Sequence, residues 1–492
     1  MGAADRRGRA VLRAVLLVIG AVSSVTPHAW AQTNDAGTLH AEDVLASSAR
    51  YAPQILEALT DVKAAEGVAL SAEGAFDTTV DTEGFGRFSG FWNGRVISTT
   101  VSQNLRTIGA TLFGGYKVSD GRFPIYEDIN FTNTAGEFKA GFILSLLRDR
   151  AFDAERAGLI DASLTVDQAA IDLLIARIGV QHRALTTYQI WVASGVQLEI
   201  YRGLLNIGLE REQGLEQRVS EGDAAEVLLI ENRQNILRRQ TLVVEAEREL
   251  QTAALALSMF YRNGTGEPVV PDARQLPDGF PDVLNIAPEI DDAVMAVAKA
   301  VRPELALVDN NLARARNTLR LAENALKPKL DFRYEVSRDF GAVAEGGISR
   351  NSTDNVLAIV FQIPLQRRDA RGRIATARAQ MQALGYERQR IGEQIIVEIR
   401  TLKAELDAAR ELVRLAIEEQ AQAETMQRIE KTRFENGLSD FFLLNMREER
   451  AADARIRRIS AQLRYFVAVA NYYAAIVDLG GLGLENMPSV LE

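Results

Sequence analysis

Apolar residues recur at alternating steps of three and four along four long stretches of the chain. Residues 149–218 and 370–434 each predict one very long helix, roughly 105 and 97 Å at a rise of 1.5 Å per residue. A shorter helix follows each of these, and the two shorter helices are expected to end near residue 261 and residue 476. The seam before Gly437 consists of Ile395, Ile399, Leu402, Leu406, Ala409 and Val413. This spacing predicts helices packed side by side at shallow angles.

The same short motif separates the long helix from the short one in both places. It reads Arg218-x-x-x-Gly222 and Arg433-x-x-x-Gly437, and the two glycines lie 215 positions apart (437 − 222). Glycine adopts a left-handed backbone without a Cβ clash, so it is the usual residue just past a helix end. The sequence therefore predicts two helical hairpins, each with a glycine at its tip.

Four other segments alternate apolar and polar residues with a period of two, which predicts β-strands. They are residues 96–118, 138–147, 330–339 and 356–365. We expect about four strands per chain, with an additional hairpin between Asp81 and Glu137 that the pattern does not place. The strand-to-helix junctions at Leu147 and at Pro364-Leu365 repeat with a spacing of 218 (365 − 147), close to that of the glycines.

These matched landmarks predict a duplicated chain. Residues 1–31 form an expected cleaved signal peptide, with a basic start, a short apolar core and a small-residue cleavage site. Residues 32–262 form the first repeat and 301–480 the second. Residues 263–300, rich in Gly, Pro and Asp, form a connector, and 481–492 a C-terminal tail.

Composition narrows the possible partners. The net charge of −10 argues against nucleic acid, and the chain contains no cysteine. Beyond the signal no segment is apolar enough for a membrane helix, so membrane contact would have to involve strands. Four strands are too few to close a barrel, so several copies would have to share one. Three copies would supply twelve strands.

An enzyme is not expected. Only His40 and His182 remain after the signal, and no glycine-rich phosphate loop follows a strand. The carboxylates lie as charges on helix faces. No cofactor and no metal site are expected.

The ordered motifs resemble the TolC family of outer-membrane efflux proteins. Besides the two turns, they are Arg302-Pro303-Glu304-Leu305, Leu326-x-Pro328-x-Leu330, Ile363-Pro364-Leu365 and Arg371-Gly372-x-Ile374. The resemblance implies a mainly α fold with a β-barrel part: a homotrimer whose outer-membrane barrel continues into a coiled-coil tunnel in the periplasm. It also implies a periplasmic adaptor and an inner-membrane transporter, forming an efflux or type I secretion duct in a Gram-negative cell. The cargo stays open.

The resemblance also implies that the hairpin tips contact the adaptor. The residues concerned are Arg218, Gly222, Arg433, Gly437, Leu438 and Ser439. The first tip departs from the pattern, with Asp223-Ala224 in place of Leu438-Ser439. The family's aperture carboxylates, expected six and nine residues after the second glycine, are replaced by Leu443 and Met446.

Asp223, Glu226 and Asp440 are candidates for an acidic ring at the periplasmic entrance. Capping of helix N-termini and compensation of the helix dipole are the alternative interpretation of these three carboxylates. For the whole chain, the alternative is a periplasmic coiled-coil adaptor or scaffold without a membrane barrel.

Overall fold

The computed structural model describes residues 37–283, 292–344 and 350–485. The expected signal peptide and the last seven residues of the expected tail lie outside these ranges. The chain divides into two compact units. The helical unit comprises residues up to 59, 172–306 and from 390 onward, and the sheet unit comprises 60–171 and 307–389.

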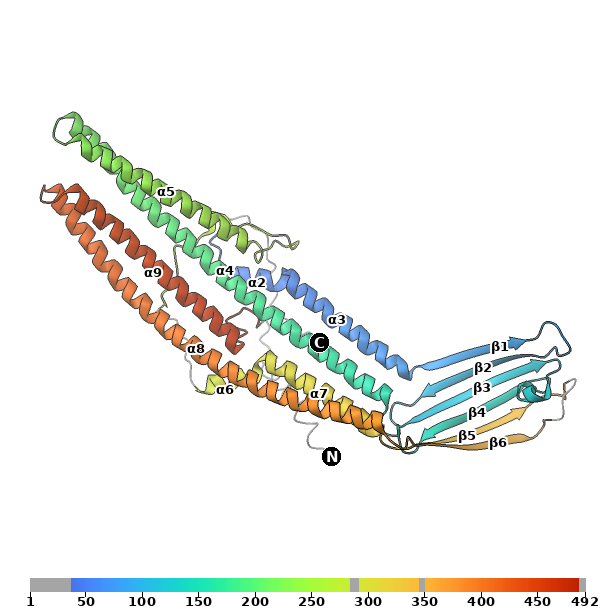
Figure 1. Ribbon diagram of the computed structural model, residues 1–492. Coiled ribbons are helices and arrows are strands. Elements are labelled where there is room, and N and C mark those ends of the chain that lie inside the picture. Colours follow the sequence, from blue (N-terminus) through green and yellow to red (C-terminus); the bar gives the residue numbers. More distant parts are fainter. Residues whose placement is uncertain (1–36, 284–291, 345–349, 486–492) are drawn as a thin grey trace, which may run out of the picture. The chain divides into compact units, whose positions relative to one another are not determined.

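The long helices form as the periodicity predicts. Helix α4 spans Ala154–Ser220 and α8 spans Arg368–Glu435, with 67 and 68 residues. Their hairpin partners are α5 (Glu226–Leu257) and α9 (Phe441–Ile476) (Figure 1). The remaining helices are α2 (Ala41–Tyr51), α3 (Pro53–Glu73), α6 (Asp292–Val301) and α7 (Pro303–Asn324). All of helix α6 except Val301 lies inside the range expected to be a connector.

The predicted seams form the core of the helical unit. Ile395, Ile399 and Val413 of α8 are almost completely buried, and so are Ala246 and Leu257 of α5. Trp191 of α4 is fully buried in the cluster that contains the α5 seam. Because such side chains interdigitate along the whole length of a hairpin, burial of this stripe holds the helices together.

The start of the tail also belongs to this core. Leu482 and Leu484 are buried against Ala49 and Ile178. His182 lies inside α4 and its Nε2 is 2.6 Å from Oδ1 of Asn471, so it is a polar contact within the helix packing.

In the sheet unit, three asparagines seven residues apart join α7 to the start of α4 and to the turn before it. The Nδ2 of Asn310 donates to the carbonyl oxygen of Leu164 and that of Asn317 to Ala157, at 2.9 and 2.8 Å. The Nδ2 of Asn324 donates to Oδ1 of Asp149 at 2.8 Å. Because a buried amide N–H without an acceptor is costly, this spacing favours a single register of the two segments.

The sheet has six strands, and the expectation of about four is wrong. In chain order they are β1 (Thr78–Gly86), β2 (Arg95–Asn104), β3 (Ala110–Asp120), β4 (Glu137–Ser145), β5 (Lys329–Asp339) and β6 (Thr353–Gln362). All pair antiparallel in that order (Figure 1). The segment 96–118, expected as one strand region, is two strands joined by a turn, and β1 completes the hairpin that the pattern did not place.

The two faces of the sheet differ sharply in polarity. Residues paired across strands share a face, and the register contains no bulge, so each face can be read from strand to strand. One face, here the apolar face, exposes large hydrophobic side chains: Val80, Ile97, Val101, Leu112, Phe138, Leu357, Ile359 and Phe361. The other, the polar face, carries most of the charged groups: Asp81, Glu83, Lys117, Glu137, Lys139, Lys329, Asp331, Arg333, Glu335, Asp339 and Asp354.

Charges on the apolar face are few and confined to one end. They are Arg95, Asp120 and Arg338, each at the strand end farther from the helices. Arg95 and Asp120 are paired with each other across β2 and β3. The rest of this face is uncharged over all six strands. Within the described residues, no helix is both long enough and apolar enough to cross a bilayer.

Candidate functional site

Both hairpin tips end their first helix with the same backbone motif. After α4, Gly222 has φ of 82° and its N–H donates to the carbonyl of Val219, while the N–H of Asp223 donates to the carbonyl of Arg218. After α8, Gly437 has φ of 72°, and the corresponding bonds run from Gly437 to Phe434 and from Leu438 to Arg433. These are Schellman caps with glycine in the left-handed position. The repeated Arg-x-x-x-Gly spacing is therefore the spacing of this cap.

The second helices begin differently. Asp440 is the N-cap of α9, and its Oδ1 accepts from the backbone N–H of Leu443 at 2.7 Å. At the first tip, Ala225 is the N-cap of α5 and makes no side-chain cap bond. Of the two interpretations of Asp440, the geometry shows capping of a helix N-terminus. Asp223 and Glu226 are exposed, and neither caps α5 with its side chain.

The second tip also buries a carboxylate. The side chain of Glu430 is 2% exposed and accepts a hydrogen bond from the Ser439 hydroxyl. Arg433 lies 3.7 Å from the same carboxylate, and its guanidinium also donates to the carbonyl of Leu438 at 3.2 Å. Ser439 and Arg433, which were expected to meet a partner, therefore also fasten the tip internally. The position seven residues before Gly222 is Leu215, a buried apolar residue.

Each tip presents apolar side chains that are largely exposed among the described residues. At the second tip, Leu438 is 69% exposed and Phe442 67%. At the first tip, Val227 and Ile230 are similarly exposed. Phe442 and Val227 occupy equivalent positions, five residues after their glycines. The sequence analysis did not predict Phe442, Val227 and Ile230 as site residues. Their signal is an apolar side chain on the helix face that was expected to be polar and solvated.

A buried ionic cluster joins the two hairpins beneath the tips. Arg239 of α5 donates to the carboxylate of Glu448 on α9 at 3.0 Å, and both side chains are almost completely buried. Arg211 of α4 donates to the other carboxylate oxygen. Arg239 further donates to Asn445 at 2.7 Å and to the carbonyl of Leu204 at 2.8 Å. Burial lowers the pKa of Arg211, and the charge of Glu448 opposes that shift.

Beside this cluster lies a groove between the two hairpins, with a volume of about 440 Å³. Arg218 of the first tip lines it together with Lys431 and Phe434 of α8. The groove brings the end of α4 to the end of α8, although the two segments are more than 200 residues apart in sequence.

The strand-to-helix junctions share an unusual backbone conformation. Asp149 has φ of 66° and Arg367 has φ of 53°, and they are 218 positions apart (367 − 149). Non-glycine residues seldom occupy this region, so its recurrence at the matched place is informative. Leu147, Pro364 and Leu365 are exposed, between the strand ends and these two residues. The two-repeat organisation stays a prediction, which this geometry supports.

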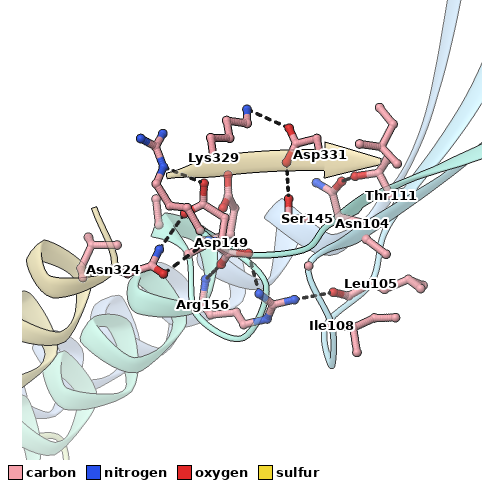
Figure 2. A pocket seen from close by; sticks show the side chains of 18 of the residues that line it. Asn104, Leu105, Ile108, Thr111, Ser145, Asp149, Arg156, Asn324, Lys329 and Asp331 are labelled. Atoms are coloured by element: carbon pink, nitrogen blue, oxygen red, sulfur yellow. Dashed lines mark hydrogen bonds and ion pairs between the residues drawn. The ribbon is translucent and has the colours of Figure 1, made fainter. Parts of the chain in front are cut away.

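A polar cavity of about 550 Å³ lies at the first junction. Figure 2 shows that its polar side chains bind one another: Lys329 with Asp331, Ser145 with Asp331, and Asn324 with Asp149. Arg156 donates to the carbonyls of Leu105 and Arg106 and pairs with Asp153. Because these groups satisfy each other's hydrogen bonds, we interpret the cavity as a structural junction between the strands and their helices, not as a ligand site.

Comparison with known proteins identifies the fold. No protein-family model and no curated protein matches the sequence. Solved structures do match it over most of the chain, among them the following three. The outer membrane protein VceC from Vibrio cholerae has a TM-score of 0.61 at 14% identity, covering 89% of this chain and 95% of that one. The Campylobacter jejuni CmeC channel has a TM-score of 0.60 at 12% identity, and the match covers 96% of this chain and 96% of that one. The Neisseria gonorrhoeae MtrE channel has a TM-score of 0.62 at 14% identity, and the match covers 95% of this chain and 96% of that one.

This chain has the fold of these outer-membrane channels. The resemblance to the TolC family is thereby confirmed for the fold. The long helical hairpins and the antiparallel sheet are the shared features.

Proposed function

We propose that this protein is the outer-membrane exit duct of a tripartite efflux or type I secretion system. In this proposal three copies form a barrel in the outer membrane of a Gram-negative cell, continued by a helical tunnel in the periplasm. A periplasmic adaptor and an inner-membrane transporter deliver the cargo. The duct has no catalytic role.

The two-faced sheet is the observation that carries the proposal. Its apolar face exposes many large hydrophobic side chains and holds charges only at one end, while the opposite face carries most of the charged groups of the sheet. A water-soluble protein rarely leaves so much apolar surface uncovered. A membrane barrel needs this alternation, with lipid on one side and an aqueous lumen on the other. A periplasmic scaffold without a barrel gives no reason for the apolar face.

The open edges of the sheet explain why several copies are needed. In the described residues β1 pairs only with β2, and β6 only with β5. In lipid, an unpaired strand edge leaves backbone N–H and C=O groups without hydrogen bonds, which costs several kcal/mol for each group. A ring in which β1 of one copy pairs with β6 of the next satisfies every edge.

The hairpin tips supply the surface for the adaptor. Leu438 and Phe442 at one tip, and Val227 and Ile230 at the other, are exposed apolar groups on rigid turns. Such groups suit the core of an interface, because their burial against a partner is favourable. In a trimer, two tips per chain give six docking positions.

A pair of neighbouring substitutions near the middle of β6 tests the membrane assignment. Leu357 lies on the apolar face and Val356 on the polar face. We expect Leu357→Arg to lose outer-membrane insertion, since an arginine facing lipid costs about 2–4 kcal/mol at mid-depth. Val356→Arg should insert normally. The readout is the amount of heat-resistant trimer in the outer-membrane fraction, and equal behaviour of the two variants contradicts the proposal.

A second test concerns the tips. Leu438→Glu and Phe442→Glu place charges in the proposed adaptor interface without touching the glycine cap. We expect the trimer to form at wild-type levels while cross-linking to the adaptor and export of cargo decline together. Export and cross-linking at wild-type levels in the double variant would remove the tips from the docking surface.

A further inference from the structure

The hairpin of β1 and β2 is the feature that the channel proposal alone does not explain. Four strands per chain would suffice for a twelve-stranded ring of three copies. The structure has six, and the additional pair precedes β3 in an uninterrupted antiparallel register. This hairpin is either a surface flap or part of the membrane wall.

The lengths of β1 and β2 favour their being part of the membrane wall. The six strands have 9, 10, 11, 9, 11 and 10 residues, and β1 and β2 are the first two of these. A strand that crosses a bilayer at a tilt needs about 9–11 residues. The hairpin is thus as long as the strands beside it, whereas a surface flap has no reason to match that length.

The distribution of charged side chains in the hairpin also matches the wall. On the apolar face, β1 contributes Val80 among threonines and glycines, and β2 contributes Ile97 and Val101 beside the uncharged Thr99 and Gln103. Val80, Ile97 and Val101 are 64%, 51% and 41% exposed, so no other described part of the chain covers them completely. The charges of β1, Asp81 and Glu83, both fall on the polar face.

On the apolar face, the hairpin also places its charge only at a strand end, as the other strands do. Arg95, the one charge that β2 places on the apolar face, is its first residue and pairs with Asp120 at the end of β3. Charges at the rim of the face lie where a barrel meets water, and there they cost little. The hairpin therefore continues both faces of β3 to β6.

We propose that the hairpin of β1 and β2 is a full part of the membrane wall, so that a ring of three copies contains eighteen strands instead of twelve. This inference rests on the proposed function and adds the size of its pore. The occupant of the open β1 edge is β6 of a second copy of this chain. Because barrel diameter grows roughly in proportion to strand number, the barrel is about 1.5 times as wide as a twelve-stranded one. At eighteen strands a barrel leaves an open aqueous channel.

Substitutions on β2 test whether the hairpin faces lipid. Val101 and Thr100 are neighbours on opposite faces near the middle of the strand. We expect Val101→Arg to lower the yield of inserted trimer at least tenfold, and Thr100→Arg to leave it near the wild-type level. If both variants insert equally well, the hairpin lies outside the membrane and the inference is wrong.

Cysteine labelling covers the case in which Val101→Arg simply fails to fold. The chain has no cysteine, so single cysteines at positions 100 and 101 report on those sites alone. In the wall, a fluorophore at 101 is quenched by nitroxide-labelled lipid and a thiol at 100 reacts with a water-soluble maleimide. Reaction of both thiols with the water-soluble reagent, without quenching by lipid, overturns the inference.

Strand counting by electron cryomicroscopy, with native mass spectrometry of the same particles, distinguishes a failure of the eighteen-stranded ring from a failure of the channel proposal. Three copies with eighteen strands are the expected result. Three copies with twelve strands and a detached hairpin contradict this inference and keep the channel proposal. Two copies with twelve strands contradict both the eighteen-stranded ring and the trimer. If the wild-type chain itself stays out of the membrane, the proposed function fails.

Discussion

The tip between α4 and α5 and the tip between α8 and α9 close with the same two backbone hydrogen bonds around a left-handed glycine. The side chains around these bonds differ. The second tip uses Asp440 as a cap and buries Glu430, whereas the first has Ala225 and the buried Leu215 at those positions. The shared turn shows that the backbone needs only the glycine, so the neighbouring positions are free to serve different contacts.

The largest effect is expected where the two hairpins are joined. Glu448→Ala removes the carboxylate that pairs with Arg239 and Arg211 and leaves two buried cations without their partner. Breaking a buried pair in this way costs about 3–5 kcal/mol. Hydrogen exchange of α5 and α9 in the purified protein should become correspondingly faster.

The neighbouring Glu449 provides the control. It lies 3.5 Å from Arg238, which is 68% exposed. A solvent-exposed pair contributes about 0–1 kcal/mol, so Glu449→Ala should leave exchange nearly unchanged. Equal effects of the two variants would show that the cluster does not hold the hairpins together.

The buried carboxylate of the second tip provides the next test. Ser439→Ala removes a hydrogen-bond donor to Glu430, and a buried acceptor without its partner costs about 1–3 kcal/mol. Adding Glu430→Leu copies the apolar pair of the first tip, Leu215 and Ala224, and should recover most of the loss. Exchange of peptides covering residues 428–445 measures both steps. A double variant no more stable than Ser439→Ala would mean that the two tips are not interchangeable.

The glycines themselves should behave alike. A Cβ at Gly222 or Gly437 would meet no atom within 4 Å, so substitution strains only the backbone. A left-handed residue with a Cβ costs about 1–2 kcal/mol, and we expect Gly222→Ala and Gly437→Ala to open their tips to a similar degree. Gly214→Ala, inside α4 and equally unobstructed, should instead stabilise by about 0.5–1 kcal/mol. Local exchange at each tip measures all three variants, and a difference between the two tips would contradict the shared geometry.

The helical unit could be predicted from the sequence because its determinants are local and repeated. The seam of Ile395, Ile399 and Leu406 recurs every three or four residues over many turns, and one glycine fixes each tip. Sequence alone could not reveal the Arg239–Glu448 pair. Its members lie 209 residues apart and look like ordinary surface charges in a helix pattern.

The sheet was predicted less well for a physical reason. The first strand reads TTVDTEGFG, with one large aliphatic residue on its apolar face, so its alternation is weak until β2 is aligned beside it. The turn between β2 and β3, residues 105–109, has no Asn-Gly or Asp-Gly signal, which hid the division of residues 96–118 into two strands. Faces of a sheet become visible only when the cross-strand register is known.

The smallest effect expected is an exchange of caps between the tips. Asp440→Ala removes the side-chain acceptor for the N–H of Leu443 and should cost about 1 kcal/mol. Ala225→Asp places a carboxylate at the equivalent position of α5, where no side chain caps the helix, and should stabilise the first tip by a similar amount. Exchange in the first turns of α5 and α9 reports both changes. If Ala225→Asp does not slow hydrogen exchange in α5, the backbone at the first tip cannot accommodate a side-chain cap. The two turns would then be equivalent only at their glycines.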